Sequence, residues 1–394
     1  MNDPVKKYRS PLILIFGTIF LDLVGFGIVI PVLPLYAERF GASPLVVGLL
    51  LGIYSAMQCL FAPILGKLSD RVGRRPVLLV SVVGTSVGFL LMGLANSLWL
   101  LFVARVIDGV TGGNISTAQA YIADVTSPKE RSRGMGLIGA AFGLGFIFGP
   151  AIGGLLSHFS LAAPFFFASV LAAVNAVAIY FFLPESLPLE RRRQIREHSS
   201  FWALFRQESQ RPLGIILAAY FFTVVSFSLL TATYALFTER RFGYSAAQNG
   251  YIFAGQGLLG VIIQGGLLGW LVKAFGDKKL AIAGTATLAL SLFLLPWSAT
   301  TAFLLWVTTG IAIGHSLVLA PLNGMASKSV NEASQGQVLG MMQSASSIAR
   351  IVGPVLGGWL LNYDALHLTR AFGRTPYATG GAITLIAVGL AMAL

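Results

Sequence analysis

The stretch GKLSDRVGRRP, Gly66 to Pro76, carries five charged side chains in eleven residues, whereas the runs on either side carry none. The run before it extends from Leu45 to Leu65, and the run after it from Val77 to Leu94. Each is long enough to cross a hydrocarbon core of about 30 Å as a helix, while charged side chains are costly inside a bilayer. The stretch is therefore predicted to be a polar turn between two membrane-spanning helices.

The same alternation of apolar runs and short polar breaks continues along the whole chain of 394 residues. The composition is 56% hydrophobic and only 11% charged, whereas soluble domains average about 25% charged residues. We therefore predict an all-α integral membrane protein with twelve transmembrane helices. The expected spans are residues 12–36, 45–65, 76–95, 98–122, 134–157, 162–183, 213–237, 246–271, 280–297, 301–326, 335–361 and 372–394.

The lysines and arginines sort unevenly between the alternate loops of a twelve-span chain. Twenty of the twenty-seven fall on the side of the two termini, five fall on the opposite side, and two, Arg105 and Arg350, fall inside spans. The positive-inside rule then predicts a multi-pass protein of the cell (inner) membrane with both termini cytoplasmic. Membrane topology thus accounts for most of the net charge of +12.

The remaining composition argues against several other classes of site. The basic residues are divided among six cytoplasmic segments and form no single face, so nucleic-acid binding is not expected. Cys59 is the only cysteine and the four histidines are scattered, so we expect neither a disulfide nor a metal site. No phosphate-binding loop of the GxxxxGK[ST] type occurs, and no cofactor is expected.

Three motifs recur in the same order in the two halves of the chain. RFGASPLVVG, from Arg39, returns as RFGYSAAQNG, from Arg241, and GPAIGG, from Gly149, returns as GPVLGG, from Gly353, at offsets of 202 and 204. A weaker copy of the opening stretch begins at Gly269. Internal repeats of this kind are typical of secondary transporters, which bind substrate between the repeats. We predict two pseudo-symmetric six-helix bundles, residues 1–184 and 212–394, joined by a cytoplasmic linker, residues 185–211, that contains the run ERRRQIRE and lies on anionic lipid.

The charged turn between the second and third spans has two interpretations. It either marks topology alone, or it also latches one conformation by pairing with charges on neighbouring helices. Asp70 and Arg71, at the end of the second span, are expected to make these pairs, while Arg74 and Arg75 begin the next helix. The residues assigned to such a latch are Gly66, Asp70, Arg71, Gly73, Arg74 and Arg75.

Four charged residues fall at membrane depth, where they are usually retained in a bundle interior or a wet cavity. Asp22 lies halfway along the first span, and Arg350 lies in the eleventh. Arg105 and Asp108 lie in the fourth span with i, i+3 spacing, so they share a helix face. Asp22 is a candidate for proton coupling, with an aspartate bonded only for packing as the alternative. Asp108 is the natural partner of Arg105, and the plainest interpretation of the two is a static ion pair.

Several of these stretches together resemble the major facilitator superfamily. GKLSDRVGRRP resembles its signature loop, LLFVARVIDGVTGG its fourth-span motif, and GLGFIFGPAIGG the fifth-span motif associated with proton-coupled antiporters. LDLVGFGIVIPVLP and YIADVTSPKERSRGMG resemble the tetracycline/proton antiporters and their drug-exporting relatives. The resemblance implies the major facilitator fold, a proton-coupling role for Arg105 together with its partner Asp108, and a leak-blocking helix seam. That antiporter seam consists of Gly145, Gly149, Pro150, Gly153 and Gly154.

The chain also departs from the tetracycline exporters. Those exporters carry acids in the third and ninth spans and a histidine in the eighth, where this chain has Gly88, Leu288 and Gly260. Arg350 instead resembles the arginine of related organic-anion carriers, which makes an anionic or zwitterionic substrate plausible.

We therefore expect a secondary active transporter, not an enzyme, that exchanges protons for a small amphiphilic, drug-like molecule by alternating access and works as a monomer. The alternative is a carrier of organic anions or zwitterions that uses Arg350, by symport or facilitated passage. A transport-inactive receptor or scaffold and, with less support, a membrane enzyme are the rivals from other classes. The predicted substrate-contacting residues are Arg350, Tyr54, Gln58, Asn114, Gln119, Tyr234, Gln256, Gln264, Asn323 and Gln343.

Overall fold

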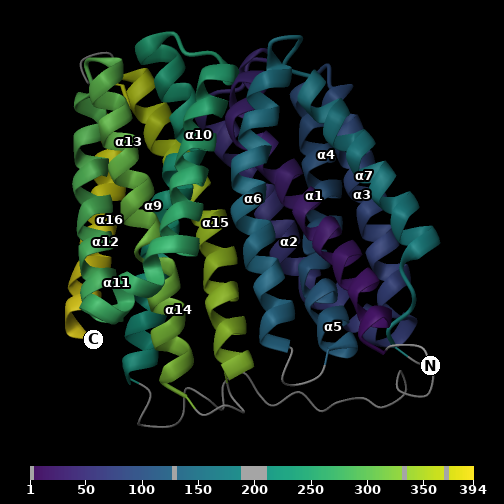
Figure 1. The fold of residues 1–394 in the computed structure, drawn as a ribbon. Coiled ribbons are helices and arrows are strands. Elements are labelled where there is room, and N and C mark those ends of the chain that lie inside the picture. The colour runs from purple at the N-terminus through teal and green to yellow at the C-terminus, as the bar shows by residue number, and fades with distance from the viewer. Residues whose placement is uncertain (1–3, 127–130, 188–210, 331–334, 368–371) are drawn as a thin grey trace. The chain divides into compact units, whose positions relative to one another are not determined.

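The computed structural model of the chain describes residues 4–126, 131–187, 211–330, 335–367 and 372–394, and these form helices and turns without strands (Figure 1). Twelve of its helical segments are long and apolar enough to cross a membrane, as the sequence predicts. The α-helices are α1 (Pro4–Glu38), α2 (Pro44–Val72), α3 (Arg74–Gly93), α4 (Leu98–Thr111), α5 (Ile115–Val125), α6 (Arg131–Ser157), α7 (Ala163–Phe182), α9 (Arg211–Phe242), α10 (Ala246–Val261), α11 (Leu268–Phe275), α12 (Asp277–Leu294), α13 (Thr301–Ser316), α14 (Leu319–Lys328), α15 (Gln335–Leu366) and α16 (Arg374–Ala393).

Three of the twelve predicted spans are not continuous α-helices. The fourth contains a 3₁₀ turn, Gly112–Asn114, and the tenth is broken between α13 and α14. The eighth contains a π-helical turn, Ile262–Leu267. The breaks in the fourth and tenth spans lie at matching places in the two repeats, and such paired interruptions mark ligand sites in many transporters.

The helices form two compact units, each described here by itself. Unit 1 comprises Met1–Gly41, Ile53–Arg196 and Ser245–Ala254, and unit 2 comprises Ala42–Gly52, Glu197–Tyr244 and Gly255–Leu394. The helices α2 and α10 therefore each contribute their first turns to one unit and the rest to the other. Most of the predicted linker, residues 185–211, lies outside the described residues.

Glycines let α1 and α6 pack at very short range in unit 1. A Cβ added at Gly149 would lie 2.7 Å from the Cα of Gly27, and one added at Gly145 would lie 2.5 Å from the Cβ of Leu23. Pro150 lies inside α6 and also faces Gly27. Of the predicted seam residues, Gly145, Gly149, Pro150 and Gly153 thus contact the first span, whereas Gly154 faces α10. The leak-blocking role stays a prediction.

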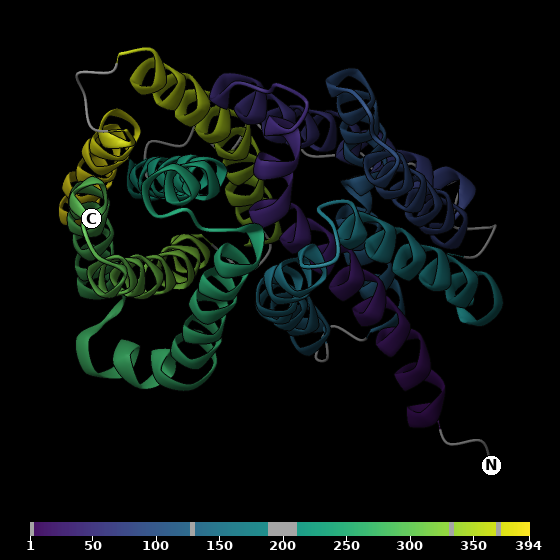
Figure 2. The same cartoon turned by 90° about the horizontal axis from the view of Figure 1, so that it is seen from above.

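Unit 2 repeats this seam between α9 and α15. A Cβ at Gly353 would lie 2.6 Å from the Cβ of Ser228, and one at Gly357 would lie 2.9 Å from the Cγ of Leu229. Seen from above, α9 lies inside unit 2 against α13, α14, α15 and α16 (Figure 2). The repeat in the sequence therefore corresponds to a repeat in helix packing.

A second pair of glycine contacts involves α2 and α10, the two helices that are divided between the units. In unit 1, a Cβ added at Gly154 of α6 would lie 3.1 Å from the Cα of Gly250 of α10. In unit 2, a Cβ added at Gly358 of α15 would lie 3.0 Å from the Cα of Gly48 of α2. The two contacts are equivalent in the repeat, since Gly48 and Gly250 are 202 residues apart.

The α1–α6 seam leads to a stability prediction. Gly149→Ala is expected to lower the free energy of unfolding by about 1–3 kcal/mol, because the new methyl group meets backbone that cannot rotate away. Thermal unfolding of the detergent-purified protein measures the effect. Gly139→Ala on the same helix is the control, since nothing lies within 4 Å of its added Cβ. Equal melting temperatures for the two variants would contradict the packing role assigned to Gly149.

Candidate functional site

The centre of unit 1 holds a buried ion pair on α4. Arg105 Nη1 lies 2.8 Å from Asp108 Oδ2, and the two side chains are 1% and 5% exposed. The Cζ atom of Arg105 also lies 4.2 Å from the centroid of the Tyr54 ring, within the range of a cation–π contact. The two residues with i, i+3 spacing thus form an ion pair, as expected. The guanidinium of Arg105 contacts both the Asp108 carboxylate and the face of the Tyr54 ring.

The 3₁₀ turn after α4 is held by α2. Gln58 Nε2 donates a hydrogen bond to the Gly112 carbonyl oxygen at 2.8 Å and lies 3.2 Å from the Tyr54 hydroxyl. Gly113 packs closely on α2, because a Cβ added there would lie 2.9 Å from the Cα of Ala62. Gln58 therefore satisfies the backbone carbonyl group at the break, and Tyr54 helps to hold the Gln58 side chain in position.

Asn114, the last residue of the turn, reaches Asp22 on α1. Its Nδ2 atom donates a hydrogen bond to Asp22 Oδ2. Asn114 is 2% exposed, whereas Asp22 is partly exposed. Asp108 lies within electrostatic range of the Asp22 carboxyl group. The three predicted coupling residues are thus brought together by α1 and α4, and Asn114 links them to the broken span.

Gly88 on α3 faces this cluster. A Cβ added at Gly88 would lie 2.9 Å from the Cβ of Asp108 and 3.3 Å from the carbonyl oxygen of Ala104. The third span therefore has no room for a side chain at this position, and the Asp108 side chain of α4 occupies the adjacent space.

Unit 2 holds Arg350 in a polar environment. Its Nη1 and Nη2 atoms donate hydrogen bonds to the hydroxyls of Ser346 (3.0 Å) and Ser347 (3.3 Å), one turn earlier on α15. Tyr220 of α9 lies beside Arg350, Ser346 and Asn323. Sequence reasoning missed Tyr220, although a tyrosine inside an apolar run is a usable signal. This group can present an oriented guanidinium, two hydroxyls and an amide to an anion.

The other predicted substrate-contacting residues are placed in different environments. Tyr234 is fully buried on α9, near Thr308 and Tyr377. Gln119 and Gln343 are exposed on their helices, and Gln256 is partly buried on α10. The polar candidates therefore divide into buried clusters and exposed positions, a distinction that spacing alone does not make.

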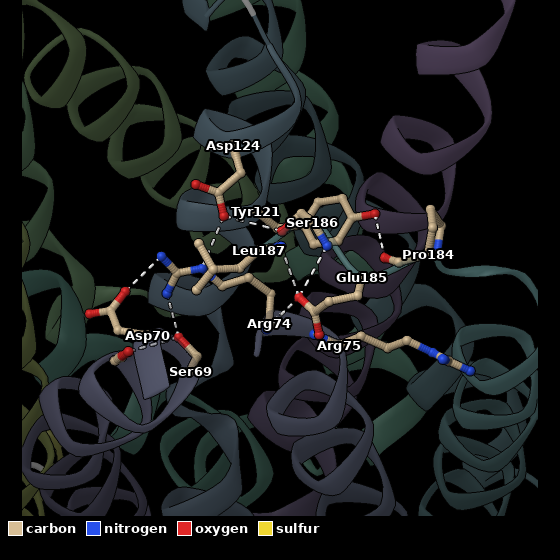
Figure 3. Close-up of polar contacts among 11 residues, drawn as sticks. Ser69, Asp70, Arg74, Arg75, Tyr121, Asp124, Pro184, Glu185, Ser186 and Leu187 are labelled. Atoms are coloured by element: carbon tan, nitrogen blue, oxygen red, sulfur yellow. Dashed lines mark hydrogen bonds and ion pairs between the residues drawn. The ribbon is translucent and has the colours of Figure 1, made fainter. Parts of the chain in front are cut away.

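The residues of the charged turn form a polar cluster, here called the latch cluster after its predicted role, around Arg74 (Figure 3). Its guanidinium contacts Asp70 at 2.7 Å, Asp124 at 3.1 Å and the Ser69 hydroxyl at 2.6 Å. Arg74 is 7% exposed, whereas Arg71, the arginine expected to make these pairs, is exposed. Gly73 permits the sharp turn before α3 because its φ is 115°.

Glu185, at the start of the predicted linker, adds a contact that sequence reasoning missed. Its carboxylate accepts hydrogen bonds from the backbone N–H groups of Arg74 at 2.9 Å and Arg75 at 3.3 Å (Figure 3). These N–H groups belong to the first turn of α3 and have no partner within the helix, so an acidic side chain stabilises them. The cluster thus joins α2, α3, α5 and the end of the sixth span.

The latch cluster leads to a second stability prediction. Arg74→Lys is expected to lower the free energy of unfolding by about 1.5–3 kcal/mol, because a single ammonium group cannot reach Asp70, Asp124 and Ser69 together. The matched control is Arg71→Lys, three residues away and exposed. Thermal unfolding of both variants is the measurement, and an equal loss in the two would contradict the assignment of Arg74 as the centre of the cluster.

Comparison with known proteins agrees with this architecture. The model of the Major Facilitator Superfamily matches residues 15–273 and 216–394. The class C tetracycline resistance protein of Escherichia coli is 37% identical over 363 residues, 89% of each chain. Multidrug resistance protein 2 of Bacillus subtilis (strain 168) is 29% identical and aligned over 100% of this chain and 97% of its own.

Among solved structures, the human organic anion transporter MFSD10 (TETRAN) superposes with a TM-score of 0.72 and is 26% identical, covering 98% of this chain and 99% of its own. The chain therefore belongs to the Major Facilitator Superfamily and is a multi-pass membrane transporter.

Proposed function

We propose that this transporter is a proton-coupled antiporter that exports a small amphiphilic, drug-like molecule. The observation that carries the proposal is the cluster in unit 1, where the partly exposed Asp22 lies among Asn114, Asp108 and Arg105. A carboxylate at membrane depth can exist in charged and neutral forms, and nearby charges shift the balance between them. Asp22 is therefore the proposed proton carrier, and the Arg105–Asp108 pair is proposed to sense substrate or helix movement.

The names of the relatives support the substrate class. They are described as tetracycline and multidrug resistance proteins, which is consistent with export of amphiphilic drugs. With both termini cytoplasmic, as the charge distribution predicts, protons would enter the cell as substrate leaves. A membrane potential of 100 mV contributes about 2.3 kcal/mol per proton to such export. The Arg74 cluster is proposed to hold one of the alternating conformations, and the transporter is proposed to work as a monomer.

Proteoliposomes test this proposal directly. With an imposed pH gradient, ethidium and tetracycline, assayed separately, are the probes for accumulation against a concentration gradient. Antiport predicts accumulation of at least one probe that collapses when nigericin dissipates the pH gradient. Flux of both probes that is indifferent to the gradient would contradict proton coupling.

A second candidate function is transport of organic anions through the Arg350 group. It is favoured by the guanidinium held by Ser346 and Ser347, and by the description of one similar structure as an organic anion transporter. Uptake of an aromatic carboxylate that is lost in Arg350→Gln and insensitive to the pH gradient would support this candidate over antiport. Retention of that uptake in Arg350→Gln would contradict it.

A further inference from the structure

Two buried polar atoms near the break in the tenth span have no hydrogen-bond partner among the described residues. They are Nε2 of Gln256, on α10, and Nδ1 of His315, in the last turn of α13. Buried polar atoms are nearly always satisfied, so an orphan in a native protein points to a water molecule, an ion or a ligand. The sequence placed Gln256 among the substrate contacts but assigned nothing to His315.

Helix geometry places both groups around one contact between α10 and α13. A Cβ added at Gly260 would lie 3.4 Å from the Ser316 hydroxyl, so these two positions face each other. Gln256 precedes Gly260 by one turn on the same face of α10, and His315 directly precedes Ser316. Gln256 and His315 therefore each lie within one turn of the Gly260–Ser316 contact along their own helices.

Comparison of the two repeats shows which side chain is missing at this place in unit 2. Gln58 and Gly260 are equivalent at an offset of 202, and Gly112 and Ser316 at 204. In unit 1, the Gln58 side chain fills this position and bonds the broken backbone at Gly112. In unit 2, Gly260 has no side chain to do so. The side-chain bond that Gln58 makes in unit 1 therefore has no counterpart from Gly260 in unit 2.

His315 is also held in a fixed orientation. Its ring stacks on Phe227 of α9, with centroids 3.7 Å apart and planes at 12°. Phe227 lies seven residues, or two turns, after Tyr220 on α9, which places it about 10 Å along the helix from the Arg350 group. The imidazole and the arginine group therefore lie along one helix of unit 2 at a separation typical of a small organic molecule.

We infer that Gln256 and His315 form a second contact point for the transported molecule in unit 2 and bind an oxygen acceptor such as a carbonyl group. This inference rests on the second candidate function, transport of organic anions through the Arg350 group, and deepens it. It predicts a preferred substrate class, namely aromatic acids whose carboxylate contacts Arg350 and whose second oxygen lies about 10 Å away. Gln256 Nε2 donates to that oxygen, and His315 donates when its Nδ1 carries the proton.

A pair of matched probes tests the inference by equilibrium binding to the purified full-length protein. The probe 4′-acetylbiphenyl-4-carboxylate carries the distal carbonyl oxygen, and 4′-isopropylbiphenyl-4-carboxylate has the same shape without it. We expect the protein to bind the acetyl probe at least about tenfold more tightly, because the isopropyl probe leaves the two buried groups unsatisfied. His315→Leu and Gln256→Leu should each reduce this ratio towards one while retaining binding of the isopropyl probe, which also reports that the variant is folded.

Controls separate this inference from the proposed function. His158→Leu, at an exposed histidine, should keep the full ratio, and Arg350→Gln should weaken binding of both probes together. A wild-type ratio near one, or a ratio that survives in both leucine variants, would overturn the inference even where Arg350-dependent binding persists. Failure to bind either probe would overturn it as well, while loss of proton coupling alone would affect only the antiport proposal.

Discussion

Asp22→Asn is expected to abolish proton-driven accumulation while leaving substrate binding at neutral pH within about twofold of wild type. Asparagine keeps the size of the side chain and can still bond Asn114, but it cannot take up or release a proton. Accumulation of ethidium or tetracycline in proteoliposomes with an imposed pH gradient, together with binding to the purified protein, measures both parts of the prediction.

The matched control for this variant is Asp277→Asn. Asp277 begins α12 and pairs with Lys328 of α14 at 2.6 Å, and both residues belong to unit 2. The control should accumulate the probe like wild type. Unchanged accumulation in Asp22→Asn would remove Asp22 from the mechanism, whereas loss of binding in that variant would make it a substrate contact instead.

Breaking the Arg105–Asp108 pair should have the largest effect on stability. Arg105→Leu is expected to reduce the free energy of unfolding by about 3–5 kcal/mol, because it leaves the Asp108 carboxylate buried without its cation. Arg105→Leu combined with Asp108→Leu should recover most of that loss, since the uncompensated charge is removed with its partner. Thermal unfolding of the two single variants and the double variant gives the coupling energy.

The double variant also separates structure from function. It should be nearly as stable as wild type and yet fail to accumulate substrate in response to a pH gradient. Additive destabilisation by the two substitutions would show that the residues do not act as a pair. Normal proton-driven accumulation in a stable double variant would assign the pair to structure alone.

Much of the architecture could be predicted because the bilayer imposes simple rules on the sequence. The twelve spans follow from run length, and the repeat follows from motifs at constant offset. The Arg105–Asp108 pair follows from i, i+3 spacing within a single helix. In each case the information is local along the chain.

Contacts between helices were harder to predict. The bond between Asn114 and Asp22 depends on the break at Gly112–Asn114 and on how α1 and α4 cross, and no local pattern contains either. Glu185 and Tyr220 were missed for the same reason, because their partners lie on other helices.

The charged turn between α2 and α3 shows how the backbone conformation of one glycine decides which arginine forms ion pairs. Arg71 and Arg74 are both arginines of the same short motif, and the position of Arg71 at a helix end favoured it, wrongly, as the residue that pairs. The positive φ of Gly73 turns the chain, so Arg74 enters α3 facing Asp70 and Asp124 while Arg71 remains exposed.

The central claim, that substrate and proton movements are obligatorily exchanged, is tested most directly by running the reaction in reverse. Proteoliposomes with pyranine inside, no initial pH gradient and an imposed gradient of a transported probe report proton movement through the protein. The account predicts proton flux opposite to the probe in wild type and none in Asp22→Asn. Probe flux through wild type without any change of internal pH would contradict it.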